Sequence, residues 1–183
     1  MTIKNDILFN IVAGNVGDLG VITLNRPTAL NALTKPMCTA INKQLCAWAV
    51  DSAIKAVVIR GMGERAFCAG GDVRAIYDNG IAKISDSQDF FDNEYRMNHS
   101  LFHFPKPYIA LLHGIVMGGG LGVSVHGSHR VAAENVVMAM PETGIGFYPD
   151  IGGSYFLSRC PGKTGLYLGL TGARVTARDA LFL

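Results

Sequence analysis

Strand-like and helix-like segments alternate along the whole of this 183-residue chain. The strand-like segments are short apolar runs closed by turn-forming residues, at positions 21–24, 56–59, 108–112 and 136–140. Thr34 is suited to cap a helix with Met37, Ile41, Leu45 and Trp48 on one face, and a second helix is expected over residues 86–103. The alternation predicts an α/β fold with parallel crossovers. The uniformly apolar run 56–59 predicts a strand covered on both faces.

Charge and composition exclude several classes of protein. The 16 Lys and Arg residues nearly balance 14 Asp and Glu residues, so the net charge of +2 provides no basic surface for nucleic acid. The apolar stretch 108–127 contains two histidines and several glycines, so we predict no transmembrane helix and no membrane partner. The four cysteines lack the spacing of metal ligands, which predicts free thiols and no metal site. The first six residues resemble no targeting peptide, which favours a cytoplasmic location.

Two clusters of glycines follow predicted strands, where ligands bind in sheets of this kind. Ala69, Gly70 and Gly71 come before Asp72, which can begin a helix, and residues 118–120 come before a further helical segment. Glycines at a helix start expose free N–H groups that favour negative charge. An ordinary tight loop with a helix cap explains either cluster alone. Taken together, the clusters suggest a second interpretation, an oxyanion hole in which two N–H donors converge on one oxygen.

Two further glycines belong to a loose dinucleotide-binding pattern. Gly61, Gly63 and Ala66 match the G-x-G-x-x-A spacing after a predicted strand. The pattern requires a helix to follow, and Gly70 and Gly71 would interrupt such a helix. We therefore expect no nicotinamide or flavin cofactor.

Two carboxylates, Glu142 and Asp150, lie in the glycine- and proline-rich stretch 140–153 after the last predicted strand. Its two prolines and four glycines exclude a continuous helix, so both carboxylates are expected on loop backbone. Apolar surroundings raise the pKa of a carboxyl, which suits it to proton transfer. The alternative is that both are helix caps or surface acids. His113 and His126 lie in apolar stretches and are interpreted as core histidines.

At these motifs the sequence resembles the crotonase (enoyl-CoA hydratase/isomerase) superfamily, and most of all its 3-hydroxyisobutyryl-CoA hydrolase branch. The resemblance implies a crotonase-like (ClpP/crotonase) ββα spiral core over residues 1–183, with the C-terminal helical part of the family missing. It also implies a coenzyme A thioester substrate and no separate cofactor. The carbonyl oxygen would lie between the N–H groups of Gly71 and Gly119, with Ala69 and Gly70 in the binding loop. A homo-oligomer is left open.

Two features favour the hydrolase branch within this resemblance. A typical hydratase has a catalytic glutamate two residues after its three glycines, where this chain has Gly122. The hydrolase-like pattern Pro-Glu-Thr-x-Ile-Gly-x-x-Pro-Asp is intact around Glu142 and Asp150, and Glu94 matches a substrate-contacting glutamate.

The resemblance implies conversion of 3-hydroxyisobutyryl-CoA and water to 3-hydroxyisobutyrate and CoA, a reaction of valine degradation. Glu142 would act as nucleophile or base. Asp150 would bind the substrate hydroxyl and assist proton transfer, and Glu94 would fix the acyl end. The alternatives are an enoyl-CoA hydratase or isomerase, or a non-catalytic acyl-CoA-binding fragment. A eukaryotic source would change the expected location to the mitochondrial matrix.

Overall fold

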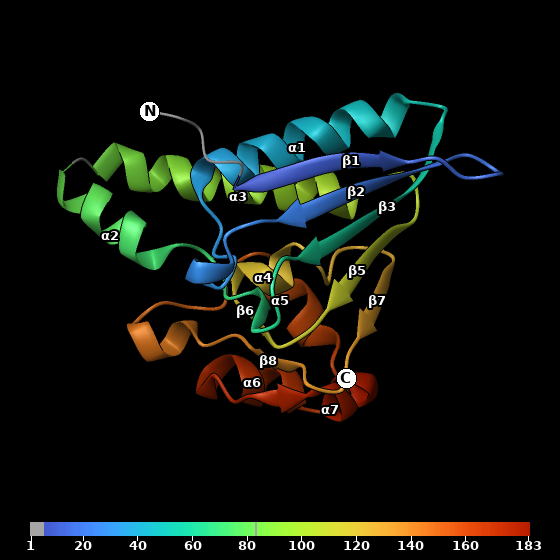
Figure 1. Cartoon of the computed structure of the whole chain (residues 1–183). Helices are drawn as coiled ribbons and strands as arrows, with labels where there is room; N and C mark the ends of the chain where they lie inside the picture. The colour runs from blue at the N-terminus through green and yellow to red at the C-terminus, as the bar shows by residue number, and fades with distance from the viewer. Residues whose placement is uncertain (1–5, 83) are drawn as a thin grey trace.

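The computed structural model describes residues 6–82 and 84–183, and their strands form two sheets (Figure 1). The larger sheet has the order β1-β2-β3-β5-β7 and the smaller one the order β4-β6-β8-β9. The pairs β1·β2 and β8·β9 are antiparallel, and the other neighbours are parallel. The bounds of the strands are β1 Ile7–Val12, β2 Asp18–Leu24, β3 Ile54–Gly61, β4 Ala66–Cys68, β5 Tyr108–Leu112, β6 Ile115–Met117, β7 His129–Ala132, β8 Val137–Ala139 and β9 Val175–Thr176.

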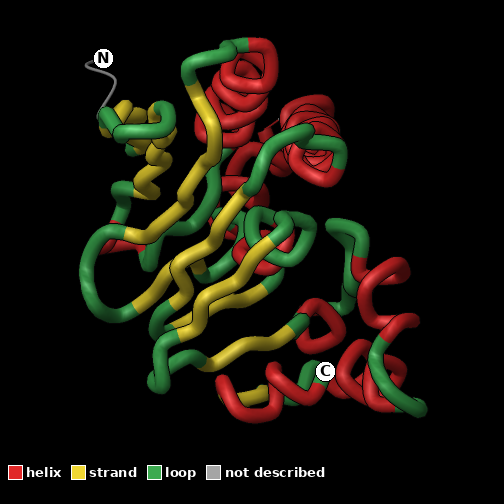
Figure 2. Tube along the Cα trace, turned by 90° about the vertical axis from the view of Figure 1, so that its right-hand side faces the viewer, coloured by secondary structure: helices red, strands yellow, loops and turns green. Residues whose placement is uncertain are grey.

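Helices lie between these strands, as the alternation predicted. The two long helices α1 and α3 pack side by side along the larger sheet, while α6 and α7 lie near β8 at the other end (Figures 1 and 2). The α-helices are α1 Lys35–Val50, α2 Val73–Ala82, α3 Ile84–Phe102, α4 Gly119–Gly122, α5 Gly153–Phe156, α6 Thr164–Thr171 and α7 Ala177–Phe182. The 3-10 segments are η1 Pro27–Ala29, η2 Glu142–Ile145 and η3 Leu157–Arg159.

The apolar stripe of α1 is buried as predicted, because it packs into the core cluster that β2 and β3 also line. Thr34 is at the N-cap position, but its side chain makes no capping hydrogen bond. The prediction that β3 is covered on both faces is wrong. Burial alternates along the predicted run, since Val57 and Ile59 are buried while Ala56 and Val58 on the other face are only partly buried. No helix in the described ranges is long and apolar enough to cross a membrane.

The second glycine cluster follows a strand that the sequence did not predict. Gly118 comes directly after β6, not after the predicted strand 108–112, because the chain makes a break at His113 and Gly114 and then joins the smaller sheet. The expected helix through Val123 and Val125 is also shorter, since α4 ends at Gly122 and continues as turns.

The smaller sheet positions the three sequence motifs. Strands β4, β6 and β8 are parallel neighbours, so their carboxyl ends lie at one edge of the sheet. The loop 69–72 follows β4, the glycines 118–120 follow β6, and Glu142 follows β8. Motifs that are far apart along the sequence therefore meet at one edge, as expected for ligand sites in open parallel sheets.

Candidate active site

The loop after β4 is held against two neighbouring segments. The Ala69 amide donates to the Leu30 carbonyl over 3.0 Å, and the Leu33 amide donates to the Gly70 carbonyl over 2.8 Å. Gly70 has a φ of +108°, which favours glycine, and a Cβ there would lie 3.0 Å from the Met117 carbonyl oxygen. This glycine therefore allows the loop to approach the end of β6 closely.

Gly71 and Gly119 place two backbone amides side by side. A Cβ on Gly119 would lie 3.3 Å from the Gly71 nitrogen. Neither N–H donates a hydrogen bond to the described part of the chain. Two neighbouring free amides at helix starts form the arrangement that stabilises an oxyanion.

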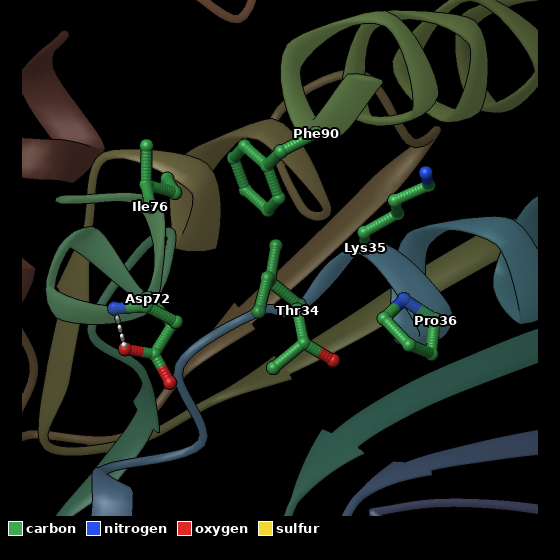
Figure 3. A pocket seen from close by; sticks show the side chains of 8 residues that line it. Thr34, Lys35, Pro36, Asp72, Ile76 and Phe90 are labelled. Atoms are coloured by element: carbon green, nitrogen blue, oxygen red, sulfur yellow. Dashed lines mark hydrogen bonds between the residues drawn. The ribbon is translucent and has the colours of Figure 1, made fainter. Parts of the chain in front are cut away.

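A pocket of about 270 Å³ borders the outer side of the Gly71 loop (Figure 3). It is lined by residues of α1, α2 and α3 and by residues of the loops that lead into α1 and α2, and Phe90 points into it (Figure 3). A Cβ on Gly71 would lie 3.0 Å from Phe90 Cζ and 3.7 Å from Ile76 Cδ1, so these side chains pack against Gly71. Glu142 and Asp150 do not line this pocket.

Glu142 begins η2, so it lies on a short 3-10 turn and not on open loop. Its side chain is buried against Gly118, where a Cβ would lie 2.7 Å from Glu142 Oε1. Glu142 Oε2 is buried with no hydrogen-bond partner among the described residues. Burial raises the pKa of this carboxyl to about 7, with a further contribution from the charge of Asp150. The carboxyl is therefore close to half ionised at neutral pH.

Glu94 reaches the same glycines from α3. It is 3% exposed, its Oε1 has no partner among the described residues, and a Cβ on Gly119 would collide with this oxygen. Burial raises the pKa of Glu94 to about 8, and the charges of Asp150 and Glu142 add to the shift. The carboxyl is therefore mainly protonated at neutral pH, and it can donate as well as accept a hydrogen bond.

Asp150 lies on loop backbone as predicted, and its Oδ2 accepts a hydrogen bond of 2.8 Å from the Tyr95 hydroxyl. Burial raises the pKa of Asp150, and the hydrogen bond from Tyr95 acts in the opposite direction. The structure thus brings Gly71, Gly119 and Glu142 together and places Asp150 within electrostatic range of Glu142.

Two polar residues of α3 were not predicted to belong to this region. Tyr95 and Asn98 lie within the helix predicted over residues 86–103, and neither was named as a site residue. Asn98 is 6% exposed, and neither atom of its amide has a partner within the described ranges. A Cβ on Gly122 would lie 3.1 Å from Asn98 Oδ1. The spacing of Glu94 and Asn98, four residues apart on one helix face, was the available signal.

The two histidines differ in their surroundings. His126 Nε2 is 2.6 Å from the Ile151 carbonyl oxygen, as expected of a partnered core histidine. His113 Nε2 is buried without a partner among the described residues, so the interpretation of a satisfied histidine is wrong there. In the described part of the chain, no group of His, Cys, Asp and Glu could hold a metal ion.

A family model described as enoyl-CoA hydratase/isomerase matches residues 19–183. The chain belongs to this family. The zebrafish (Danio rerio) protein named 3-hydroxyisobutyryl-CoA hydrolase, mitochondrial, is 55% identical over 175 residues, covering 96% of this chain and 45% of that protein. The Homo sapiens protein of the same name is 49% identical over 179 residues, covering 98% of this chain and 46% of that protein. The chain spans about half the length of these relatives.

Solved structures of enoyl-CoA hydratase/isomerase relatives share the fold. The crystal structure of a carnitinyl-CoA dehydratase from Mycobacterium thermoresistibile has a TM-score of 0.92 at 49% identity, covering 98% of this chain and 52% of that one. An enoyl-CoA hydratase from Rhodobacter sphaeroides 2.4.1 has a TM-score of 0.91 at 46% identity, and the match covers 97% of this chain and 52% of that one. The predicted crotonase-like α/β fold is confirmed, and the chain covers part of it. The hydrolase relatives are named as mitochondrial, so the comparisons give no support to the cytoplasmic prediction.

Proposed function

We propose that this chain carries the core of a thioester hydrolase that converts 3-hydroxyisobutyryl-CoA and water to 3-hydroxyisobutyrate and CoA. The observation that carries the proposal is the pairing of two free amides, of Gly71 and Gly119, with the buried Glu142 carboxylate beside them. The absence of a carboxylate at Gly122 supports hydrolysis over hydration, because addition of water to a double bond is helped by two carboxylates near one water.

The thioester carbonyl oxygen would lie between the Gly71 and Gly119 amides, which stabilise the negative charge that develops on it. Each such donor contributes on the order of 10²–10³ in rate. The donors are part of the backbone and are fixed before the substrate arrives, so they need no reorganisation during the reaction.

Glu142 would act on the carbonyl carbon in one of two ways. As a nucleophile, its carboxylate forms a bond to the carbonyl carbon, the C–S bond breaks, and CoA leaves as a thiol after taking a proton. Water then hydrolyses the mixed anhydride. As a general base, Glu142 takes a proton from the water that attacks the carbonyl carbon directly, and the C–S bond then breaks as the CoA sulfur takes a proton. Both routes require the ionised form, so kcat/KM is expected to rise as the pH passes through about 7, the pKa of Glu142.

Asp150 and Glu94 would bind and orient the acyl group. An ionised Asp150 accepts the hydrogen bond of the substrate hydroxyl and assists proton transfer. A protonated Glu94 is able to donate to the acyl end beside Gly119. We also place the reaction in valine degradation and in mitochondria, because the zebrafish and human relatives are named mitochondrial 3-hydroxyisobutyryl-CoA hydrolases.

The deciding experiment measures release of CoA thiol from 3-hydroxyisobutyryl-CoA by this chain. Glu142→Gln should lower kcat by about 10²–10⁴, while Glu134→Gln, at an exposed turn, serves as the matched control. Single turnovers in ¹⁸O water would place label in Glu142 if water attacks a covalent intermediate at the glutamyl carbon. Trapping with hydroxylamine would detect the anhydride if water attacks the acyl carbon. A fully active Glu142→Gln enzyme contradicts the proposal.

A hydratase or isomerase is the second candidate, because the two solved structures reported above are named as a dehydratase and a hydratase. Loss of enoyl absorbance from crotonyl-CoA without thiol release from the hydroxy ester would favour that candidate. Calorimetric binding of CoA esters without any turnover would indicate a non-catalytic acyl-CoA binder.

A further inference from the structure

Tyr95 connects α3 to the segment that carries Asp150. Its hydroxyl donates a hydrogen bond of 2.8 Å to Asp150 Oδ2, although the two residues are 55 positions apart in the sequence. Of the two carboxylate oxygens, Oδ2 is therefore engaged by α3. The remaining lone pairs, on Oδ1 in particular, are the ones that a substrate hydroxyl would use.

An aromatic contact supports the same connection. The Phe91 ring lies one turn of α3 before Tyr95, with 6.0 Å between the two ring centroids. Phe91 also stacks on Phe147, with centroids 5.7 Å apart and an interplanar angle of 29°. Because Phe147 lies three residues before Asp150, this stack and the hydrogen bond hold the segment 147–150 against α3 at two points.

The backbone after Asp150 has a conformation that needs such support. Ile151 has a φ of 44°, in the left-handed region, which a β-branched residue rarely adopts. A residue of this kind keeps that conformation only when its surroundings fix it. His126 Nε2 contacts the Ile151 carbonyl oxygen at 2.6 Å on one side, and Tyr95 binds the preceding carboxylate on the other.

We propose that Tyr95 is a positioning residue, which fixes the Asp150 carboxylate so that its second oxygen meets the hydroxyl of the acyl group. This inference rests on the proposed function, which assigns substrate binding and proton transfer to Asp150. Tyr95 remains a donor at neutral pH, because burial and then the Asp150 hydrogen bond raise the pKa of its hydroxyl.

The electrostatic consequence has a definite sign. The hydrogen bond from Tyr95 lowers the pKa of Asp150, and burial raises it. Removing the hydroxyl therefore raises the pKa of Asp150 further, so the ionisation of Asp150 shifts to higher pH in the pH–rate profile, apart from the limb that Glu142 sets at about 7. Glu94, Glu142 and Tyr148 are the other titratable groups that interact with this pair. They remain in the Tyr95→Phe variant, which keeps the ring and its contact with Phe91.

The first test compares Tyr95→Phe with the unchanged chain in the thiol-release assay. A lost hydrogen bond to a charged group corresponds to a fall in kcat/KM of about tenfold to a hundredfold. Tyr167→Phe is the matched control, since Tyr167 is an exposed tyrosine on α6, away from Asp150 in the sequence, and its kcat/KM should stay within about twofold. An unchanged rate and pH profile in Tyr95→Phe would overturn the inference.

A double-mutant cycle then separates positioning from packing. If Tyr95 acts through Asp150, Tyr95→Phe should cause no further loss in an Asp150→Ala background. Equal losses in both backgrounds would mean that the hydroxyl has a merely structural role and would overturn the inference. Melting temperatures of all four proteins show whether each is folded.

The same cycle measured as Kd for 3-hydroxyisobutyryl-CoA keeps this inference distinct from the proposed function. Non-additive effects on Kd without thiol release would retain the role of Tyr95 and reject hydrolysis. A chain that neither binds nor cleaves the ester would reject both.

Discussion

A single methyl group at residue 119 tests the two-amide arrangement directly. In Gly119→Ala, the new Cβ would lie 3.3 Å from the Gly71 nitrogen, 3.2 Å from Leu33 Cδ1, and in collision with Glu94 Oε1. The methyl group therefore occupies space beside the amides, where a thioester oxygen would have to approach. Loss of one oxyanion donor costs about 10²–10³ in kcat, or about 2.7–4 kcal/mol.

The effect on folding should be much smaller than the effect on rate. Glu94 Oε1 is the end of a flexible side chain that can rotate away, whereas Leu33 is fully buried and must shift by a few tenths of an ångström. Overpacking of this kind costs about 1–3 kcal/mol, and alanine in place of glycine in a helix returns about 0.5–1 kcal/mol. We expect Gly119→Ala to remain folded while its kcat falls by about 10²–10³.

The assay pairs thiol release with thermal unfolding. Gly144→Ala is the matched control, because a Cβ there meets nothing within 4 Å and the residue lies in the neighbouring segment η2. It should leave both kcat and Tm near their original values. A Gly119→Ala protein whose kcat stays within about threefold of the unchanged chain would refute the oxyanion assignment, since one lost donor should cost far more.

Three further predictions concern stability. Replacing the unpartnered, buried Asn98 by leucine should leave the free energy of unfolding unchanged or raise it by about 1–3 kcal/mol, while thiol release falls; a destabilised variant in urea unfolding would contradict this. The pKa of Glu94 is about 8 in the folded protein, against 4.5 for an ordinary glutamate, so the folded protein binds the proton of this carboxyl more tightly than the unfolded chain does. Stability is therefore lost as the pH rises from about 4.5 to about 8. Glu94→Gln should flatten the decline of Tm between acidic and weakly alkaline pH. A variant whose Tm declines with pH as steeply as that of the unchanged chain would contradict this prediction. Arg26→Met should lower the free energy of unfolding by about 2–4 kcal/mol, because it removes the ion pair of 2.9 Å with Asp72. Arg96→Met, which removes an exposed ion pair with Asp92, is the control and should change the free energy of unfolding by less than about 0.5 kcal/mol in urea unfolding.

Much of the fold follows from local sequence patterns, namely hydrophobic periodicity and turn-forming residues. The apolar stripe of α1 and the run that forms β5 were identified because periodicity and turn residues define such elements within a few positions. Strand β6 has only three residues and β9 only two, so neither provides enough positions for a periodic pattern. The antiparallel strand β1 was also not predicted, and it depends on pairing with β2.

The candidate site was predictable where its residues belong to compact motifs. Gly71, Gly119 and Glu142 each follow a strand within a glycine- or proline-rich stretch, so composition marked these stretches and the family resemblance then selected the residues. Tyr95 and Asn98 could not be recognised in this way, because they lie inside a long amphipathic helix. Their neighbours in space are Asp150 and Gly122, more than 20 residues away along the chain, and only the fold brings them together.

The glycine at position 122 and the arrangement around Asp150 depend on each other. A Cβ at this position would lie 3.1 Å from Asn98 Oδ1 and 3.1 Å from Ile151 Cβ, both closer than ordinary van der Waals contacts. Ile151 has little freedom to move, because its backbone is in the left-handed region and its carbonyl contacts His126. A glutamate at 122 would therefore have to displace Asn98, or else shift Ile151 and with it the adjacent Asp150. A second carboxylate of the hydratase type and the present Asp150 geometry are thus alternatives in one space, which is why we argue for thioester hydrolysis.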